Sequence, residues 1–298
     1  MSPKFIFIPS SAPAGPYLYD TYPAFYGVSA ARQLKSGIPN IEELRRASDN
    51  DEVNVAFDSG EKTLNSLVTG GSTLGTWSTG TDAFSVKPYD QSGNGIVLEQ
   101  NTGASQPKSI TAGSLVTLGP NNKPSWDNSS TLGWKSTGNV DLSSESEVWM
   151  FIYMQVNNLN ANRQSIFRIR DNINWANGDI LFDFNNSSIR IGVHNGTTFV
   201  IDEYSTFPFV GDYYLTVRIN LNVVGTGVTE LWINSVSQLP TSQQPNILTN
   251  FGNRPFNLLV TNADGNPLNS KFSEFNLYTG NQSSNRTSIE SNLTSFYG

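Results

Sequence analysis

The sequence contains no cysteine and a single histidine, His194. Without cysteine, the chain has no disulfide framework, no thiolate metal site and no cysteine nucleophile. One histidine excludes zinc or iron sites built from several imidazoles and leaves a Ser-His-Asp triad with one candidate base. These absences exclude cysteine-dependent enzymes and enzymes whose metal is held by thiolates or by several imidazoles.

Charged residues are also scarce. They make up 14% of the 298 residues, and the formal net charge of −7 argues against a nucleic-acid-binding surface. No apolar run reaches the length of about 18 residues that suggests a membrane-spanning helix. We therefore expect neither nucleic acid nor a membrane among the partners of this chain.

The first residues combine a lysine with the short apolar stretch from Phe5 to Ile8. A signal peptide needs a hydrophobic region of about 7–15 residues, so this stretch is too short. Proline and glycine within residues 1–16 favour an extended conformation. We expect residues 1–16 to form an N-terminal arm that packs on another molecule, and residues 17–298 to form one domain.

Turn-forming residues are abundant. Asn, Ser and Thr fill 94 positions, with 25 Gly and 15 Pro, and 34 aromatic side chains supply a core. Short apolar segments alternate with Asn, Gly and Ser clusters at roughly ten-residue spacing, which is typical of a sandwich or barrel. The unbroken apolar run 148–156 predicts a central strand that is buried on both faces. Further strands are predicted within 37–58 and at 165–170, 179–184, 188–193, 198–203, 213–223, 229–233, 256–261 and 272–278.

Helices are expected in few places. Apolar residues at helical spacing predict a short helix within 23–34, and 61–67 is compatible with one or two helical turns. A last helix places Ile289, Leu293 and Phe296 on one face. The predicted fold is therefore all-β, with a short N-terminal helix and a C-terminal helix.

One charged cluster lies early in the chain. We interpret Glu42-Glu43 and Arg45-Arg46 as surface residues, with Asp49 available as an ion-pair partner for the arginines. An ion pair of Arg45 and Arg46 with Asp49 would tie the first strands to the loop at 89–95.

Three stretches together resemble a known family. They are Arg-Arg-Ala-Ser-Asp-Asn at 45–50 with the tyrosine-rich segment 17–22, Tyr-Asp-Gln-Ser-Gly-Asn-Gly at 89–95, and Phe-Ser-Glu-Phe at 272–275 with the closing segment. This order resembles the catalytic domain of the α-L-arabinofuranosidase B family, across nearly the whole chain. The resemblance implies a concanavalin A-like (LamG-type) two-sheet jelly roll. Similar modules with a closing helix also recur in bacteriophage structural proteins.

The resemblance also indicates where the family's site residues would lie. Trp175 matches the substrate-stacking tryptophan, Asn185 stands where the family has its nucleophilic glutamate, and Asp264 matches the acid/base aspartate. A retaining glycosidase needs two carboxylates about 5–5.5 Å apart. An uncharged amide is a poor nucleophile. The resemblance therefore implies a relative without enzymatic activity.

Two alternatives remain open. A shift of two residues in this correspondence places Asp183 at the nucleophile position, facing Asp264, and predicts a residual arabinofuranoside hydrolase. Otherwise a sugar-binding groove remains, with Trp175 stacking on the sugar and Asp183, Asn185, Asn186 and Asp264 hydrogen-bonding its hydroxyls. The competing interpretation is that Trp175 packs against a loop and that the asparagines form turns.

Other polar residues have two interpretations as well. Arg168 and Arg170 share one face of a predicted strand and either bind an acidic group or lie on a solvated sheet face, balanced by acids such as Asp183 or Glu203. His194 precedes Asn-Gly, which predicts a hairpin turn. Concanavalin-like folds can bind calcium through loop carboxylates, but no Asp-x-Asp-x-Asp loop is present, so we predict no cofactor.

These observations favour a non-enzymatic structural protein of a bacteriophage virion, either a capsid decoration, a head fibre or a tail-associated adhesion component. The arm at 1–16 would contact other virion proteins, and the absence of cysteine suits assembly in a reducing host cytoplasm. A homo-oligomer and a host-surface glycan are the partners expected in that role. The alternative is a carbohydrate-binding, lectin-like surface protein.

Overall fold

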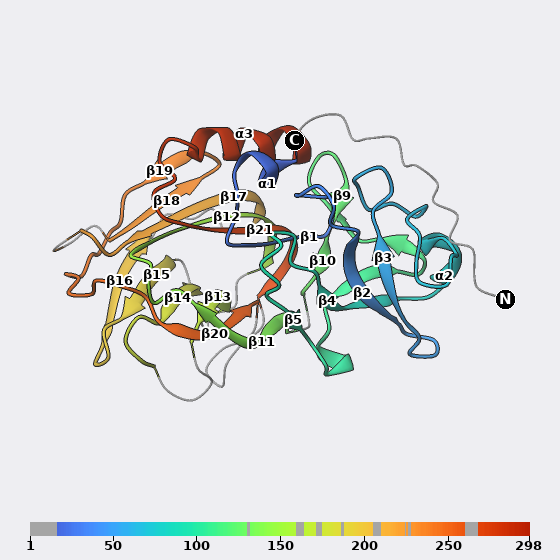
Figure 1. Ribbon diagram of the computed structural model, residues 1–298, viewed down its shortest axis with the longest axis horizontal. Helices are drawn as coiled ribbons and strands as arrows, with labels where there is room; N and C mark the ends of the chain where they lie inside the picture. The colour runs from blue at the N-terminus through green and yellow to red at the C-terminus, as the bar shows by residue number, and fades with distance from the viewer. Residues whose placement is uncertain are drawn as a thin grey trace.

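The computed structural model describes residues 17–129, 132–158, 164–170, 175–185, 188–204, 210–223, 225, 228–259 and 268–298. Two large antiparallel sheets pack face to face in this part of the chain, with the main hydrophobic core between them (Figure 1). The predicted all-β, two-sheet sandwich with helices near both ends is confirmed. The expected arm at 1–16 lies outside the described residues.

The larger sheet contains twelve strands among the described residues. Ten follow the order β19 (Val236–Gln238), β18 (Thr229–Ile233), β17 (Gly211–Asn220), β12 (Glu147–Asn158), β21 (Asn269–Thr279), β10 (Trp126–Asp127), β6 (Lys108–Thr111), β4 (Ala83–Pro88), β2 (Asn40–Arg46) and β3 (Glu52–Ala56). In addition, β1 (Tyr26–Ser29) pairs with β21, and β7 (Ser114–Leu115) pairs with β6.

The smaller sheet contains seven strands among the described residues. Their order is β16 (Phe199–Tyr204), β15 (Ser188–His194), β14 (Ile180–Asn185), β13 (Gln164–Ile169), β20 (Asn253–Leu258), β11 (Trp134–Asp141) and β5 (Leu98–Glu99). A separate hairpin joins β8 (Thr117–Leu118) to β9 (Lys123–Pro124).

The central strand β12 is buried on both faces, as its apolar run predicts. Its even-numbered side chains from Val148 to Val156 enter the core between the sheets. Trp149, Phe151 and Tyr153 point to the other side, where they form a second cluster with helix residues. An alternating polar pattern is absent from β12 because both of its faces are covered.

Four short helical segments are described: α1 (Leu18–Thr21), α2 (Leu74–Trp77), the 3₁₀ helix η1 (Gly103–Ser105) and α3 (Arg286–Tyr297). The helices α1 and α3 lie side by side over the outer face of the larger sheet (Figure 1). The predicted face of α3 is confirmed for Ile289 and Leu293, which are buried, whereas Phe296 is only half-buried. Tyr297 is the further buried contact of this helix.

Two helix predictions are wrong. Residues 23–34 contain strand β1, which pairs with β21 from the far end of the chain. Residues 61–67 form turns and isolated bridges. In both segments, long-range pairing prevails over a local helical spacing of apolar residues.

The surface assignment of Glu42 is also wrong. Its side chain is fully buried and forms an ion pair with Lys62, which is equally buried. Ser109 Oγ donates a hydrogen bond to Glu42 Oε1 at 2.9 Å, and Trp126 Nε1 donates to Oε2 at 2.5 Å. The residues that satisfy this carboxylate come from distant segments, so its neighbours in the sequence do not reveal its burial.

A second buried ion pair joins both ends of the domain. Arg32 donates to both oxygens of Glu274, over 2.8 and 2.9 Å, and Tyr297 Oη donates to the same carboxylate over 2.9 Å. Arg32 also donates to Asn292 Oδ1 over 2.6 Å. This carboxylate therefore connects the N-terminal segment, the core strand β21 and helix α3.

We predict that Arg32→Met destabilises the protein by about 3–5 kcal/mol, because it leaves the charge of Glu274 buried without its cation. The matched control is Arg46→Met. Arg46 pairs with Asp49 on the surface, and the loss of such a pair costs at most about 1 kcal/mol. Urea denaturation of both variants measures the difference, and equal losses would contradict the central role of Glu274.

Candidate functional site

A line of charged side chains crosses the outer face of the smaller sheet. Phe182 and Phe184 enter the core, so Asp183 between them points outward. In the strand register, Asp183 lies opposite Arg190, and Arg190 lies opposite Glu203. The pattern of alternation and pairing thus brings charges from neighbouring strands onto one face.

Asp183 is held between two arginines. Its carboxylate lies 3.7 Å from Arg168 Nη2 and 3.8 Å from Arg190 Nε, and Arg190 lies 3.9 Å from Glu203. The Asp183 side chain has 0% exposure, whereas that of Glu203 is 40% exposed. The expected balance of a strand arginine by Asp183 is confirmed for Arg168, whereas the expected solvated face is wrong, because Arg168 and Arg170 are both buried.

Trp175 lies at the other end of this face. Its half-buried ring has the Arg170 guanidinium 3.9 Å from its centre and that of Arg168 at 5.7 Å. Phe199 meets the ring edge-to-face at 4.3 Å between centroids, and His194 lies at 6.1 Å. Cations over a tryptophan face are stabilised by its quadrupole, so this cluster fixes the orientation of both the ring and the guanidinium group.

His194 has the turn position that the sequence predicts. It ends β15, and its Nδ1 accepts a hydrogen bond from the Gly196 backbone amide at 3.1 Å. Asn195 Oδ1 accepts from the amides of Thr197 and Thr198, which closes the turn toward β16. Because Nδ1 is engaged in the turn, His194 orients the aromatic cluster and needs no catalytic role to explain its position.

A buried carboxylate lies beneath this cluster. Asp179 is fully buried, accepts a hydrogen bond from the Ala176 amide at 2.8 Å and lies 3.2 Å from Arg254 Nε. Burial raises the pKa of Asp179, although the Ala176 amide and Arg254 oppose the shift. The residues after Trp175 are thereby anchored to the sheet.

The structure places three of the five predicted site residues. Trp175 and Asp183 are connected through Arg168, and Asn185 lies two residues beyond Asp183, about 7 Å further along β14 on the same face. Asn186 and Asp264 lie outside the described residues. The sequence analysis missed Arg190 and Phe199 as members of this site.

Arg190 alternates with Ile189 and Ile191, which are core residues, and this alternation was the available signal for its outward direction. Phe199 is half-buried and projects from the outer face, because it pairs with His194 in the strand register. Phe199 reaches the Trp175 cluster only because of the register between β15 and β16, and residue types alone do not determine that register.

The geometry limits the chemistry of this face. Asp183 is inaccessible to a substrate because it is buried between two guanidinium groups. Asn185 is half-buried, and its side chain is an amide.

Among the described residues, no group of three or more His, Cys, Asp and Glu side chains could hold a metal ion. In the same part of the chain, no helix is both long and apolar enough to cross a membrane.

Comparisons with known proteins show the fold. No protein-family model and no curated protein matches the chain. An arabinofuranosidase complexed with arabinofuranosyl-α-1,2-xylobiose superposes with a TM-score of 0.62 at 16% identity, over 92% of this chain and 63% of that one. A GH54 α-L-arabinofuranosidase soaked with a cyclic sulfate inhibitor gives a TM-score of 0.61 at 14% identity, with the same coverage of both chains.

The chain thus spans less than two thirds of the length of these enzymes. At such identities the similarity establishes a shared sandwich fold. This agrees with the arabinofuranosidase-like architecture that the sequence motifs imply, whereas the expected relationship to bacteriophage proteins has no support in these comparisons.

We predict that the pKa of the Asp179 carboxyl lies above its ordinary value, because the group is buried. The pKa of the Asp141 carboxyl should lie below its ordinary value, because Ser143 donates hydrogen bonds to the carboxylate. The folded state then binds the Asp179 proton more tightly than the unfolded state. This residue's contribution to stability therefore rises as the pH falls through its raised pKa.

Carboxyl NMR titration of the folded protein measures both midpoints. In a matched stability series, Asp179→Asn should remove that part of the pH dependence. A midpoint for Asp179 at or below that of Asp141 would contradict the described burial.

Proposed function

We propose that this protein binds glycans on the outer face of its smaller sheet and does not hydrolyse them. The observation that carries the proposal is the half-buried ring of Trp175, fixed by Arg170 and Phe199 on the face that also holds Asn185. Aromatic rings pack against the C–H faces of sugars, and guanidinium and amide groups hydrogen-bond their hydroxyls. The similar enzyme complexed with arabinofuranosyl-α-1,2-xylobiose supports a sugar as the ligand class.

The dimensions of the face favour an oligosaccharide. Trp175 contacts Arg168, which pairs with Leu181 in β14, and Asn185 lies four residues further along that strand. Four residues of a strand span about 13 Å. A ligand that contacts both Trp175 and Asn185 therefore extends over more than one sugar ring.

The absence of hydrolysis is part of the proposal. The position that corresponds to the family's nucleophile is the neutral Asn185, and the alternative carboxylate, Asp183, is buried and held by Arg168 and Arg190. A two-step retaining mechanism needs an accessible carboxylate at one of these positions.

The virion role stays a prediction from the sequence. Glycan binding is compatible with a bacteriophage adhesion component and with a lectin-like surface protein. The arm at 1–16, which would anchor the protein to other virion proteins, lies outside the described residues. Quantitative mass spectrometry of purified particles from the source system tests the role directly, and absence of the protein from those particles would overturn it.

We predict that Trp175→Ala weakens the binding of arabinose- and xylose-containing oligosaccharides by about tenfold or more, because it removes the stacking surface. Calorimetry on a ligand first identified on a glycan array measures the loss. The matched control is Trp232→Ala, which removes a half-buried tryptophan from the larger sheet. Unchanged binding by the Trp175 variant, or no glycan bound by the wild type, would overturn the proposed site.

We predict that the wild-type protein releases no arabinose from an activated aryl arabinofuranoside, even at high protein concentration. Asp264→Asn provides the matched control, since it removes the carboxylate that resembles the family's acid/base. Release of arabinose that this substitution abolishes would show that the chain is a hydrolase.

A further inference from the structure

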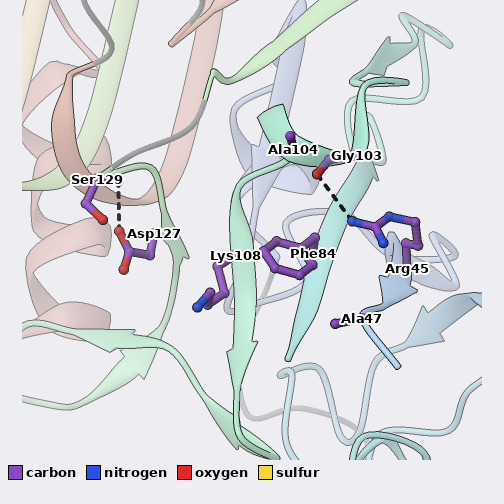
Figure 2. A pocket seen from close by; sticks show the side chains of 8 residues that line it. All are labelled: Arg45, Ala47, Phe84, Gly103, Ala104, Lys108, Asp127 and Ser129. Atoms are coloured by element: carbon purple, nitrogen blue, oxygen red, sulfur yellow. Dashed lines mark hydrogen bonds between the residues drawn. The ribbon is translucent and has the colours of Figure 1, made fainter. Parts of the chain in front are cut away.

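A cavity of about 530 Å³ opens on the larger sheet, at the strands that follow β21 in the sheet order (Figure 2). Its walls include Arg45, Phe84, Lys108 and Asp127, from β2, β4, β6 and β10. Ligand pockets have volumes of about 300–1,000 Å³, so the space suits a small molecule or part of a larger one. None of the residues in this wall belongs to the glycan site proposed above.

The four side chains form a single row across the sheet. Arg45 pairs with Phe84 in the strand register, Phe84 pairs with Lys108, and Lys108 pairs with Asp127. Directly paired residues project from the same face of a sheet. With neighbouring strands about 4.8 Å apart, the row spans about 14 Å from β2 to β10. Figure 2 shows the Phe84 ring between Arg45 and Lys108, with Asp127 beyond Lys108.

Arg45 holds a fixed positive charge. Its guanidinium donates to Gln106 Oε1 at 2.7 Å, Asn50 Oδ1 at 2.7 Å and the Gly103 carbonyl at 3.2 Å. All three acceptors are neutral, and within the described part of the chain no carboxylate lies within 4.0 Å of this guanidinium. The group is therefore oriented by its neighbours but not neutralised by them.

Lys108 is the second cation of the row, and the Phe84 ring separates it from Arg45. The Arg45 guanidinium lies 5.2 Å and the Lys108 ammonium 5.7 Å from the centre of the Phe84 ring. Lys108 also forms an ion pair with Asp82 at 2.8 Å, which leaves the positive charge of Arg45 in excess at this end. An anionic group that lies along the edge of Phe84 would approach both cations.

Asp127 places a negative charge at the other end of the row. Its Oδ1 accepts a hydrogen bond from the Ser129 amide at 2.9 Å, and the side chain is half-buried in the cavity wall. A carboxylate repels a compact multivalent anion such as phosphate but accepts hydrogen bonds from hydroxyl groups. The row therefore suits a ligand with one carboxylate and several hydroxyls.

We infer that this row is a second binding site, which takes the hexuronate residue of an acidic glycan. The sugar carboxylate approaches Arg45 and Lys108 along the edge of Phe84, its hydroxyls donate to Asp127, and its C–H groups contact the Phe84 ring. The inference goes beyond the glycan site on the smaller sheet, because it concerns different strands and a charged ligand. On a chain with a net charge of −7, such binding requires a local cation arrangement of this kind.

The test is calorimetry of the full chain with a galacturonate trisaccharide and with the matching neutral galactose trisaccharide. The wild type should bind the acidic ligand at least about tenfold more tightly, and added salt should weaken this binding. Arg45→Met and Lys108→Met should each reduce the affinity by about tenfold, and Arg45→Lys should restore part of it.

The matched control is Arg46→Met, because Arg46 follows Arg45 in β2, projects from the opposite face and pairs with Asp49. It should leave the acidic ligand bound as in the wild type. Trp175→Ala should do the same, so failure of this site and failure of the first site are distinguishable.

The inference would be overturned by no binding of the acidic trisaccharide by the wild type, by equal binding of the neutral trisaccharide, or by unchanged affinity in both Arg45→Met and Lys108→Met. Displacement of the ligand by an equal concentration of inorganic phosphate would show a general anion site and would also overturn the assignment to a uronate. Lys108→Met covers the case in which Arg45→Met fails to fold.

Discussion

The buried carboxylate of Glu274 is the constraint on which the rest of the sandwich depends. It lies on β21, at a position that pairs with β12 on one side and with β1 on the other, and accepts hydrogen bonds from Arg32, Tyr297 and Asn276. A charge removed from water is tolerated only when such donors surround it. These donors come from both ends of the described chain and from β21 itself, so the core strand reaches its final environment only when the N-terminal segment and α3 are in place. Burial, together with the charge of this carboxylate, raises the pKa of the Tyr297 hydroxyl, which therefore remains a donor.

The docking of the N-terminal segment and α3 on the larger sheet determines which sheet surfaces remain accessible to ligands. Helices α1 and α3 cover the outer face of the larger sheet at β12 and β21, where Tyr153 stacks on Tyr297 at 4.1 Å (Figure 1). The strands β10, β6, β4 and β2 continue that sheet beyond β21, and the outer face of the smaller sheet carries Trp175. Both proposed sites thus use sheet surfaces away from α3, on strands that the core fixes in position.

Local patterns predicted the strands better than they predicted their partners. The run 148–156 and the alternation in β14 and β15 follow from side-chain periodicity, and the arabinofuranosidase-like motifs indicated the sandwich. In contrast, β1 was interpreted as a helix because its pairing partner lies near the opposite end of the chain. Glu42 was interpreted as a surface residue because Lys62, Ser109 and Trp126 are distant in the sequence. At the site, the sequence identified Trp175, Asp183 and Asn185. The position of Asp183 between Arg168 and Arg190, however, depends on the register of three strands.

The charge environments of the two surfaces differ in a way that decides which ligand suits each. On the smaller sheet, the buried carboxylates Asp179 and Asp183 each lie within 4 Å of a guanidinium group, so the acidic charge there is compensated within the protein. A neutral sugar can bind beside such pairs without leaving an ion unpartnered. In the row on the larger sheet, Arg45 contacts only neutral acceptors among the described residues, and in the proposed complex the ligand carboxylate would supply the countercharge. Because an uncompensated cation favours an anionic ligand and a compensated ion pair does not, the two proposed sites would discriminate between acidic and neutral portions of a glycan.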